Sequence, residues 1–415
     1  MTSLEQQGQQ AKTAARTLAI AGTKRKNEAL EAIAVALEQW TPEILAANEA
    51  DMEAARQANM RPSLQDRLLL DAGRIAGIVE GVRQVAALPD PIGEVTKMST
   101  RPNGLTIGKR RVPMGVIGII YEARPNVTVD AAALCLKSGN ACILRGGKEA
   151  FHSNQTFVAI MREALETVSL SADCIHLVAD TSRQSAVELM HLTAYLDVLI
   201  PRGGAGLIRS VVENARVPVI ETGIGVCHVY VDGEADLDMG ARIIHNAKTS
   251  RPSVCNSAEC LLVHKDVAEA LLPKAWELLK EQEVELRGCP ETRRILGEFV
   301  LPATAEDWDT EFGDFILAVK VVADAREAID FINQHGSGHS ECVVTNNYFT
   351  AQQFLDEVDA AAVYVNASTR YTDGFEFGLG AEIGISTQKM HARGPMGLEE
   401  LTSFKYVVYG AGQIR

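Results

Sequence analysis

The spacing of apolar and polar positions divides this chain into a helical first part and a longer part that alternates between strands and helices. Over the first 90 residues the apolar side chains recur every three or four positions, as at 30–40, which predicts amphipathic helices. A break rich in proline follows at 87–93. Residues 94–113 then alternate weakly around Asn103-Gly104, a pair that favours a tight turn between antiparallel strands. The sequence therefore predicts several helices followed by a β-hairpin.

From residue 114 onward, short apolar runs alternate with stretches of helical periodicity. We expect strands at 115–121, 141–144, 174–178, 196–200, 217–220 and 226–231, then at 259–263, 315–321, 341–345, 362–365 and 404–409. We expect helices at 154–170, 183–191, 235–248, 267–282, 325–335 and 350–358. Short strands spaced by helices are typical of a doubly wound parallel sheet, and two successive sets predict two α/β domains in series.

Length and charge narrow the classes of function. A chain of 415 residues is long enough for two or three domains with a large core. The net charge of −14, without a basic block, argues against nucleic acid or an anionic membrane surface as a partner. An anionic substrate would therefore need local cations. The longest apolar run, at 116–121, is too short to span a bilayer, and the N-terminal residues lack the pattern of a signal peptide.

The eight cysteines are scattered along the chain. None forms a C-x-x-C pair, and no Cys/His spacing is typical of a zinc site, so we predict no metal. Sparse cysteines in a long chain are typical of reduced thiols in the cytosol. We therefore predict a cytoplasmic protein.

The strongest candidate for chemistry is Cys255, in the polar loop NAKTSRPSVCNSAE at 246–259. Lys248 and Arg251 lie shortly before it, and Pro252 would end a helix that arrives from the N-terminal side. Nearby cations stabilise a thiolate, which is the nucleophilic form of cysteine. Taken alone, the pattern leaves two interpretations open, a catalytic nucleophile and an inert thiol, and the second is the commoner case.

Turns after predicted strands carry glycines and cations suited to a nucleotide. One strand ends in RGGK at 145–148, which suits a ribose or phosphate but also an ordinary basic turn. The run LIPRGGAG at 199–206 ends a strand ahead of a predicted helix, where backbone N–H groups can bind a pyrophosphate. It departs from G-x-G-x-x-G and is weak evidence by itself. The segment ETGIG at 221–225 is a similar turn.

Two asparagines follow predicted strands. Asn126 comes after the strand at 115–121, where a preceding proline fixes the turn and the amide can donate to a developing oxyanion. The alternative for Asn126 is a residue that only caps a turn, the usual role of a single asparagine. Asn366 and Arg370 likewise follow the strand at 362–365.

Taken together, these residues resemble the aldehyde dehydrogenase superfamily. The features, in chain order, are the Pro125-Asn126 turn, the strand at 139–145, Glu221 and Cys255. Glu221 lies thirty-four residues before Cys255, a spacing typical of that superfamily. Glu311-Phe312-Gly313 is similar to its downstream motif, whose glutamate holds the nicotinamide ribose. The resemblance implies an aldehyde-dehydrogenase-like α/β fold, with two doubly wound α/β domains and a small β oligomerisation element.

Five longer blocks resemble the branch of that superfamily that reduces an acyl phosphate. They are YEARPNVTVD (121–130), LIPRGGAGL (199–207), NAKTSRPSVCN (246–256), YVNASTRYTDG (364–374) and HARGPMGLEELTSFK (391–405). The resemblance implies NADPH-dependent reduction of L-glutamate 5-phosphate to L-glutamate 5-semialdehyde and phosphate, a step of proline biosynthesis. Cys255 would attack the acyl phosphate and carry the thioester, and Asn126 with the Cys255 N–H would hold the oxyanion.

The resemblance also implies which residues meet the cofactor NADPH (NADP) and the substrate. The cofactor-binding residues would be Arg145, Lys148, Gly203, Gly204, Glu221, Gly223 and Glu311. The substrate-binding residues would be Arg124, Lys248, Arg251, Asn366 and Arg370. Glu221 stands where oxidative members keep the base that activates water, a step that a reductase does not need. We therefore expect a structural or cofactor-side role for Glu221.

The implied domain boundaries place the NADP-binding domain at 1–93 and 114–224 and the catalytic domain at 225–385. The oligomerisation element would consist of 94–113 and 386–415 and would make a homodimer or homotetramer. The acyl phosphate is labile, and the resemblance leaves open an association with glutamate 5-kinase, which makes it.

Two other functions stay open from the sequence. An oxidative NAD(P)-dependent aldehyde dehydrogenase would turn over without phosphate and would need Glu221 as its base. A nucleotide-binding or structural protein that kept the fold and lost the chemistry would have an unreactive Cys255. Phosphate dependence and thiol reactivity distinguish the three.

Overall fold

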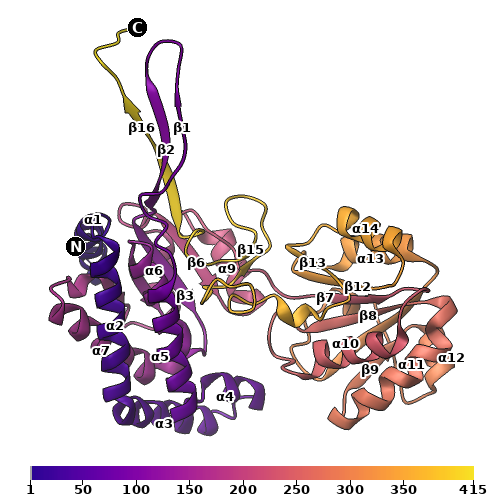
Figure 1. Cartoon of the computed structure of the whole chain (residues 1–415). Coiled ribbons are helices and arrows are strands. Elements are labelled where there is room, and N and C mark those ends of the chain that lie inside the picture. The colour runs from indigo at the N-terminus through magenta and orange to yellow at the C-terminus, as the bar shows by residue number, and fades with distance from the viewer. Residues whose placement is uncertain (1) are drawn as a thin grey trace. The chain divides into compact units, whose positions relative to one another are not determined.

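The computed structural model describes residues 2–415 and contains two compact units (Figure 1). Unit 1 comprises the chain up to Thr222 together with Gly378–Gly384 and Met396–Arg415. Unit 2 comprises Gly223–Phe377 together with Ile385–Pro395. Each unit has its own parallel sheet with helices between the strands, which confirms the predicted α/β class. The functional roles that we assigned to the domains stay predictions.

Helices open unit 1, as the apolar periodicity predicted. They are α1 (Ser3–Leu18), α2 (Thr23–Gln39), α3 (Thr41–Gln57), α4 (Pro62–Leu68) and α5 (Ala72–Ala87). In α2, Leu30, Ile33 and Leu37 are fully buried, whereas Trp40 just beyond the helix is 45% exposed. The apolar stripe read from the sequence is therefore the packed face of α2, up to the residue where the helix ends.

The parallel sheet of unit 1 has the strand order β5-β4-β3-β6. Its strands are β3 (Val116–Tyr121), β4 (Ala141–Arg145), β5 (Ile175–Leu177) and β6 (Val198–Arg202). The helices between and after them are α6 (Pro125–Lys137), α7 (Phe151–Thr167), α8 (Arg183–Met190) and α9 (Ala205–Asn214). Since β4 and β5 lie on one side of β3 and β6 on the other, the strand order reverses between β3 and β6. Parallel α/β sheets commonly bind ligands at such a point, at the carboxyl ends of the strands.

The strand predicted at 217–220 is wrong. This segment runs beside β6 and forms one isolated bridge, between Val219 and Leu199. Pro218 accepts a hydrogen bond from the Leu199 N–H at 2.8 Å but has no N–H of its own to donate. A regular ladder therefore cannot form through this segment.

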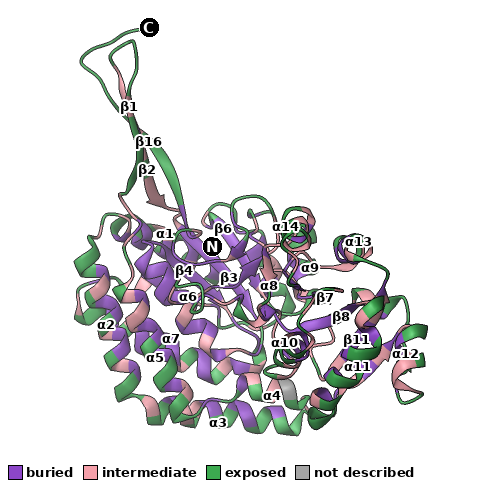
Figure 2. Cartoon of the chain, turned by 45° about the vertical axis from the view of Figure 1, so that its right-hand side comes forward, coloured by how far each residue is buried: buried purple, intermediate pink, exposed green. Residues whose placement is uncertain are grey.

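The hairpin predicted around Asn103-Gly104 is confirmed. Strands β1 (Val95–Thr100) and β2 (Thr106–Pro113) pair antiparallel, and β16 (Thr402–Tyr409) pairs with the other edge of β2. The turn places Gly104 at φ +85°, which glycine adopts without strain. Figure 1 shows this three-stranded sheet extending away from the helices of its unit, and Figure 2 shows that much of it is exposed. Tyr406 is 68% exposed.

Unit 2 contains a seven-stranded parallel sheet in the order β10-β9-β11-β8-β7-β12-β13. The strands are β7 (Cys227–Val231), β8 (Ala258–His264), β9 (Glu285–Gly288), β10 (Leu301–Pro302), β11 (Ile316–Val322), β12 (Ser340–Val344) and β13 (Ala362–Val365). The helices are α10 (Leu237–Thr249), α11 (Lys265–Leu279), α12 (Pro290–Leu296), α13 (Ala325–His335) and α14 (Tyr348–Glu357). The short strands β14 (Ile385–Ser386) and β15 (Gly394–Pro395) pair separately. We did not predict β9, α12 or β10, which are short.

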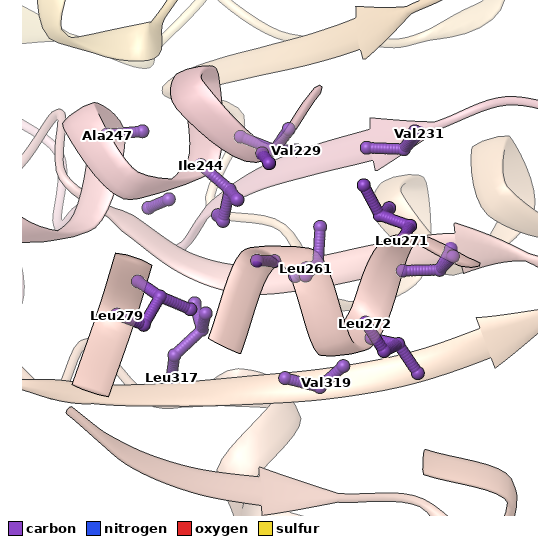
Figure 3. Close-up of a cluster of buried hydrophobic side chains, with 14 of the residues drawn as sticks. Val229, Val231, Ile244, Ala247, Leu261, Leu271, Leu272, Leu279, Leu317 and Val319 are labelled. Carbon is purple, nitrogen blue, oxygen red and sulfur yellow. The ribbon is translucent and has the colours of Figure 1, made fainter. Parts of the chain in front are cut away.

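Alternate residues of the central strands of unit 2 face opposite sides of the sheet. Val229, Val231, Leu261 and Val319 join a cluster that also includes side chains from α10 and α11 (Figure 3). Their neighbours in the same strands, such as Tyr230, pack instead with side chains of α13 and α14. Both faces of the sheet are therefore covered by helices, as expected for a doubly wound parallel sheet.

Buried Asn140 ties the C-terminal segment to the parallel sheet of unit 1, and its replacement tests that link. Its Oδ1 accepts the Gly115 N–H at 2.8 Å, and its Nδ2 donates to the Leu401 carbonyl at 2.8 Å. Asn140→Ala should lower the free energy of unfolding by about 2–4 kcal/mol because two backbone groups lose their partner. Denaturant unfolding measures this. Asn214→Ala, an exposed control, should change it by less than about 0.5 kcal/mol; equal losses would contradict the role of Asn140.

Candidate active site

Cys255 lies in the loop between α10 and β8, as the sequence predicted. Pro252 disfavours helical backbone at Arg251, so the chain leaves α10 at Thr249 and crosses to β8 in a series of turns. Cys255 is half-buried. Among the described cysteines the others are fully buried except Cys289, and no disulfide joins any of them. Partial exposure in a polar loop is the setting in which a thiol can react.

Hydrogen bonds fix this loop to the segment that follows β13. Arg370 donates from Nε to the Ser250 hydroxyl at 2.9 Å and from Nη1 to the Asn256 side-chain oxygen. The Asn256 amide donates to the Thr372 carbonyl at 2.9 Å, and the Thr369 hydroxyl donates to the Asn256 carbonyl at 2.7 Å. The residue directly after the nucleophile is therefore held at both its backbone and its side chain. We did not predict Asn256 or Thr369, although both stand inside the sequence blocks that suggested the site.

Two arginines supply positive charge at the nucleophile loop. Burial lowers the pKa of the Arg370 guanidinium, and the charge of Arg251 lowers it further. Asp373 and the thiols of Cys255 and Cys227 act in the opposite direction, which places Arg370 within electrostatic reach of the nucleophile. A guanidinium remains charged at neutral pH even so. The arrangement favours the thiolate form of Cys255.

The backbone of Cys255 packs directly on Gly225. A Cβ atom added at Gly225 would lie 1.6 Å from the Cys255 carbonyl oxygen and 2.7 Å from its Cα. Nearby, the buried Cys227 thiol donates to the same carbonyl at 3.2 Å. Only glycine fits at 225, because any side chain would have to push the nucleophile away. The sequence marked 221–225 as a turn for phosphate, and the structure gives its last glycine this different use.

The side chains of Lys248 and Asn366 both bond to other residues of unit 2. The Lys248 side chain is fully buried, and its Nζ lies 2.6 Å from the Glu259 Oε2. Asn366 uses both ends of its amide on the backbone of Thr345, at 2.9 Å each. These contacts favour structural roles, and the substrate contacts that we predicted for the two residues stay predictions.

Gly223 and Glu311 also belong to unit 2. The Gly223 N–H donates to the Ile385 carbonyl at 3.0 Å, and a Cβ there would meet the Thr387 methyl at 2.3 Å. Glu311 is half-buried and lies two residues before Gly313, whose N–H donates to Glu259. The cofactor contacts predicted for Gly223 and Glu311 stay predictions.

The remaining predicted residues gather at one edge of the parallel sheet of unit 1. Each lies at or after the carboxyl end of a strand, or of the segment 217–220 beside β6. They are Arg124, Asn126, Arg145, Lys148, Gly203, Gly204 and Glu221. Arg145 is half-buried and Lys148 exposed. This edge includes the reversal of strand order between β3 and β6, where parallel sheets bind nucleotides.

Several features of this edge fit an anionic dinucleotide. The Arg145 guanidinium is held by the carbonyls of Thr181 and Ser182, yet its buried Nε has no hydrogen-bond partner among the described residues. The buried Nε of Arg202 is likewise unmatched. Helix α9 begins after Gly204 without a side-chain cap, which leaves backbone N–H groups at a positive helix end. The Glu122 carboxylate accepts a hydrogen bond from the Gly204 N–H at 2.8 Å, so this donor already has a partner within the protein.

Asn126 is oriented by a carboxyl group that the sequence analysis did not single out. Its Nδ2 donates to the Asp130 Oδ2 at 2.9 Å, one turn further along α6. This bond uses one of the two amide hydrogens, and the other can serve an acceptor. Burial raises the pKa of Asp130 to about 6, while the Asn126 amide and the charge of Arg202 oppose that rise. The i, i+4 spacing of Asn126 and Asp130 was the signal available in the sequence, although we did not predict the helix on which it depends.

Residues 2–415 contain no group of three or more His, Cys, Asp or Glu side chains arranged to hold a metal ion. In the same part of the chain, no helix combines the length and apolar character that a membrane crossing needs.

The contact between Gly225 and Cys255 predicts that the Cys255 thiol reacts more slowly in Gly225→Ala. The added methyl group should move the Cys255 backbone away from Arg370, so less thiolate forms and alkylation of Cys255 by iodoacetamide at pH 7 should slow about tenfold. Peptide mapping by mass spectrometry follows this cysteine separately from the others. Gly77→Ala in α5, where an added Cβ meets nothing within 4 Å, is the control. An unchanged rate in Gly225→Ala would show that the loop tolerates the methyl group.

The raised pKa of Asp130 predicts a pH-dependent effect of Asp130→Asn. The folded carboxyl holds its proton more tightly than the unfolded one, with a pKa of about 6 against 3.8. Between these values the folded state of the wild type loses stability as pH rises, and the amide, which cannot ionise, avoids that loss. The stability of Asp130→Asn relative to wild type should therefore increase from pH 4 to pH 7, measured by urea unfolding. Asp356→Asn, the same change at an exposed position of α14, is the matched control; a pH-independent difference for Asp130→Asn would contradict the raised pKa.

Comparison with known proteins now identifies the family. A model of the aldehyde dehydrogenase family matches residues 3–293 and 305–407. The γ-glutamyl phosphate reductase of Enterococcus faecalis is 60% identical over 415 residues, which cover 100% of this chain and 99% of that protein. The enzyme of the same name from Carboxydothermus hydrogenoformans is 61% identical over 405 residues, covering 98% and 97%. The crystal structure of γ-glutamyl phosphate reductase from Thermotoga maritima aligns with a TM-score of 0.95 at 48% identity and covers 100% of both chains. The chain therefore belongs to the aldehyde dehydrogenase family.

Proposed function

We propose that this protein catalyses the reduction of γ-glutamyl phosphate (L-glutamate 5-phosphate) to L-glutamate 5-semialdehyde and phosphate, with NADPH as reductant, in proline biosynthesis. The observation that carries the proposal is an identity of about 60%, over nearly the whole chain, to relatives named for this reduction. The half-buried Cys255, with Arg370 in electrostatic reach, also supports the proposal because such a thiol can act as a nucleophile.

Cys255 is the proposed nucleophile. Its thiolate attacks the carbonyl carbon of the acyl phosphate, and phosphate leaves with the electron pair of the broken C–O bond. Phosphate is a good leaving group as an anion, so this step needs no strong acid. The product of the step is a γ-glutamyl thioester on Cys255, and the hydrogen bonds around Asn256 keep its sulfur in place.

Backbone and side-chain groups of the chain stabilise the charges of this reaction. The Cys255 N–H and the Asn126 amide are the proposed donors to the tetrahedral oxyanion. Arg370 and Arg251 are the proposed ligands of the substrate anions in unit 2, and Arg124 is our candidate in unit 1. An acidic protein needs such local cations to bind a substrate with several negative charges.

A nicotinamide cofactor follows from membership of the family, and NADPH is our proposal for its form. When bound, the reduced nicotinamide supplies hydride to the thioester carbonyl. The proposed contacts of the chain with the dinucleotide are Arg145, Lys148, Gly203, Gly204 and Glu311. The C–S bond to Cys255 then breaks, and its electron pair goes to the sulfur. This step releases the aldehyde and restores the Cys255 thiolate.

The proposed direction of the reaction leaves Glu221 without a role as base. An oxidative aldehyde dehydrogenase must activate water to hydrolyse its thioester, whereas a reductase releases the product by reduction. Relatives named for reduction do not favour the oxidative alternative. We propose a structural or cofactor-side role for Glu221, so Glu221→Gln should retain reductase activity.

The exposed three-stranded sheet supports a proposal about assembly. Its two outer strands, β1 and β16, have no further strand beside them within residues 2–415, and β16 exposes Phe404, Tyr406 and Val408. We propose that it joins copies of the chain into a homodimer or homotetramer. We also propose a cytoplasmic location, since the described cysteines form no disulfides. Association with glutamate 5-kinase, which would protect the labile acyl phosphate, stays a prediction.

The function is tested most directly in reverse, because the acyl phosphate decomposes. Purified protein is mixed with NADP⁺, glutamate 5-semialdehyde and inorganic phosphate, and absorbance reports the reduced nicotinamide. We expect reduction that requires phosphate and is faster with NADP⁺ than with NAD⁺. Cys255→Ala should reduce the rate by about 10⁴-fold or more, since it removes the nucleophile. Cys289→Ala, which alters the other half-buried cysteine, should keep the wild-type rate.

Each alternative has its own outcome in this assay. Equal rates with and without phosphate, together with loss of activity in Glu221→Gln, would show an oxidative dehydrogenase. No reduction of either nicotinamide by the wild type would show a protein that lacks this chemistry. Retained activity in Cys255→Ala would remove the thioester route even if the overall reaction occurs.

A further inference from the structure

Beneath the nucleophile loop, unit 2 contains a buried ion pair that the mechanism does not use. Lys248 near the end of α10 and Glu259 in β8 are 0% and 1% exposed, and Nζ lies 2.6 Å from Oε2. Burial raises the pKa of Glu259 to about 7, and Lys248 opposes the rise. Burial lowers the pKa of Lys248, and Glu259 opposes that change. Each partner thus favours the charged form of the other, against the effect of burial.

The pair closes the base of the loop that carries Cys255. Lys248 lies seven residues before the cysteine and Glu259 four residues after it. A second contact lies next to the pair, where the Ser257 hydroxyl donates to the Ala247 carbonyl at 3.0 Å. The loop between these residues is therefore pinned where it leaves α10 and where it enters β8.

The same carboxylate also reaches the turn that contains Glu311. Its second oxygen, Oε1, accepts the Gly313 N–H at 3.1 Å. Gly313 is two residues after Glu311, the proposed ligand of the nicotinamide ribose, and both precede β11. Thus one oxygen of Glu259 contacts Lys248 at the start of the nucleophile loop, and the other accepts a hydrogen bond from the turn that contains Glu311.

Stability alone gives a weak reason for this arrangement. A buried ion pair can often be replaced by apolar side chains of similar size without loss of stability, because desolvation offsets the attraction. What apolar side chains cannot replace is the acceptor for the Gly313 N–H. The contact between Glu259 and Gly313 is therefore the part of this cluster that can be tested apart from folding.

We propose that Glu259 is a positioning residue that holds the Cys255 loop and the Glu311 turn in fixed register, with Lys248 as its charge partner. The proposal rests on the proposed function for the identity of the cofactor. It predicts that loss of the hydrogen-bond acceptor at position 259 weakens nicotinamide binding even when the charges of Glu259 and Lys248 are removed together. It also predicts that loss of the ion pair loosens the thiol loop.

Two double variants separate these effects. Lys248→Met/Glu259→Leu removes both charges and the acceptor, whereas Lys248→Met/Glu259→Gln removes both charges but keeps a side-chain oxygen for the Gly313 N–H. Relative to the second variant, the first should bind NADPH about threefold to tenfold more weakly, which is the effect of one net hydrogen bond. Fluorescence titration of the full-length protein measures the dissociation constant. In both variants iodoacetamide should alkylate Cys255 more slowly than in wild type.

The controls keep the test independent of folding and of the reaction. Thermal unfolding checks that both variants fold, and if neither does, Glu259→Asp, which keeps the charge and shortens the arm, replaces them and should weaken NADPH binding in the same direction. Equal NADPH affinities in the two double variants, with wild-type alkylation rates, would overturn the proposal and leave a structural ion pair. Failure of the proposed function would appear separately, as wild-type protein that binds NADPH but shows no phosphate-dependent reduction.

Discussion

The candidate active site depends on the close packing of one backbone segment against another. The carbonyl of Cys255 lies where any side chain at position 225 would have to be, and the same carbonyl accepts the Cys227 thiol. The loop is also bonded to 368–372 through Asn256 and Arg370. A nucleophile held by two other segments of the chain loses little freedom when it reacts, which is one way in which enzymes lower the entropic cost of a bimolecular step.

Arg370 is a positive charge that is held in place at the nucleophile loop. The chain as a whole carries a net charge of −14, yet Arg370 lies within electrostatic reach of Cys255. Arg370 also makes three of the contacts that hold the loop, so its guanidinium is oriented by the same bonds that place the thiol. A cation fixed in this way stabilises a thiolate without having to reorganise during the reaction.

The candidate nucleotide-binding residues of unit 1 and the nucleophile of unit 2 lie at different ends of their parallel strands. In unit 1 the residues follow the carboxyl ends of parallel strands, which is where α/β folds usually bind nucleotides. In unit 2, Cys255 precedes β8 and Gly225 precedes β7, so both lie at the amino ends of the strands. The turn of Gly313, which precedes β11, lies at that same edge. This edge can bring 225, 255 and 313 together because β7, β8 and β11 are parallel neighbours in the sheet.

By itself, the sequence determined the α/β class, most strands and helices, the hairpin at Asn103-Gly104 and the position of Cys255 in a polar loop. These follow from local patterns: apolar periodicity, turn-forming pairs and short motifs. The tertiary structure decided which contacts the candidate site residues make. Lys248 is buried against Glu259, and both ends of the Asn366 amide bond to the Thr345 backbone. Gly225 packs against Cys255, thirty positions away in the sequence. A charged or amide side chain looks the same in sequence whether it faces a ligand or a buried partner. Only the packing of distant segments shows which polar groups are already paired.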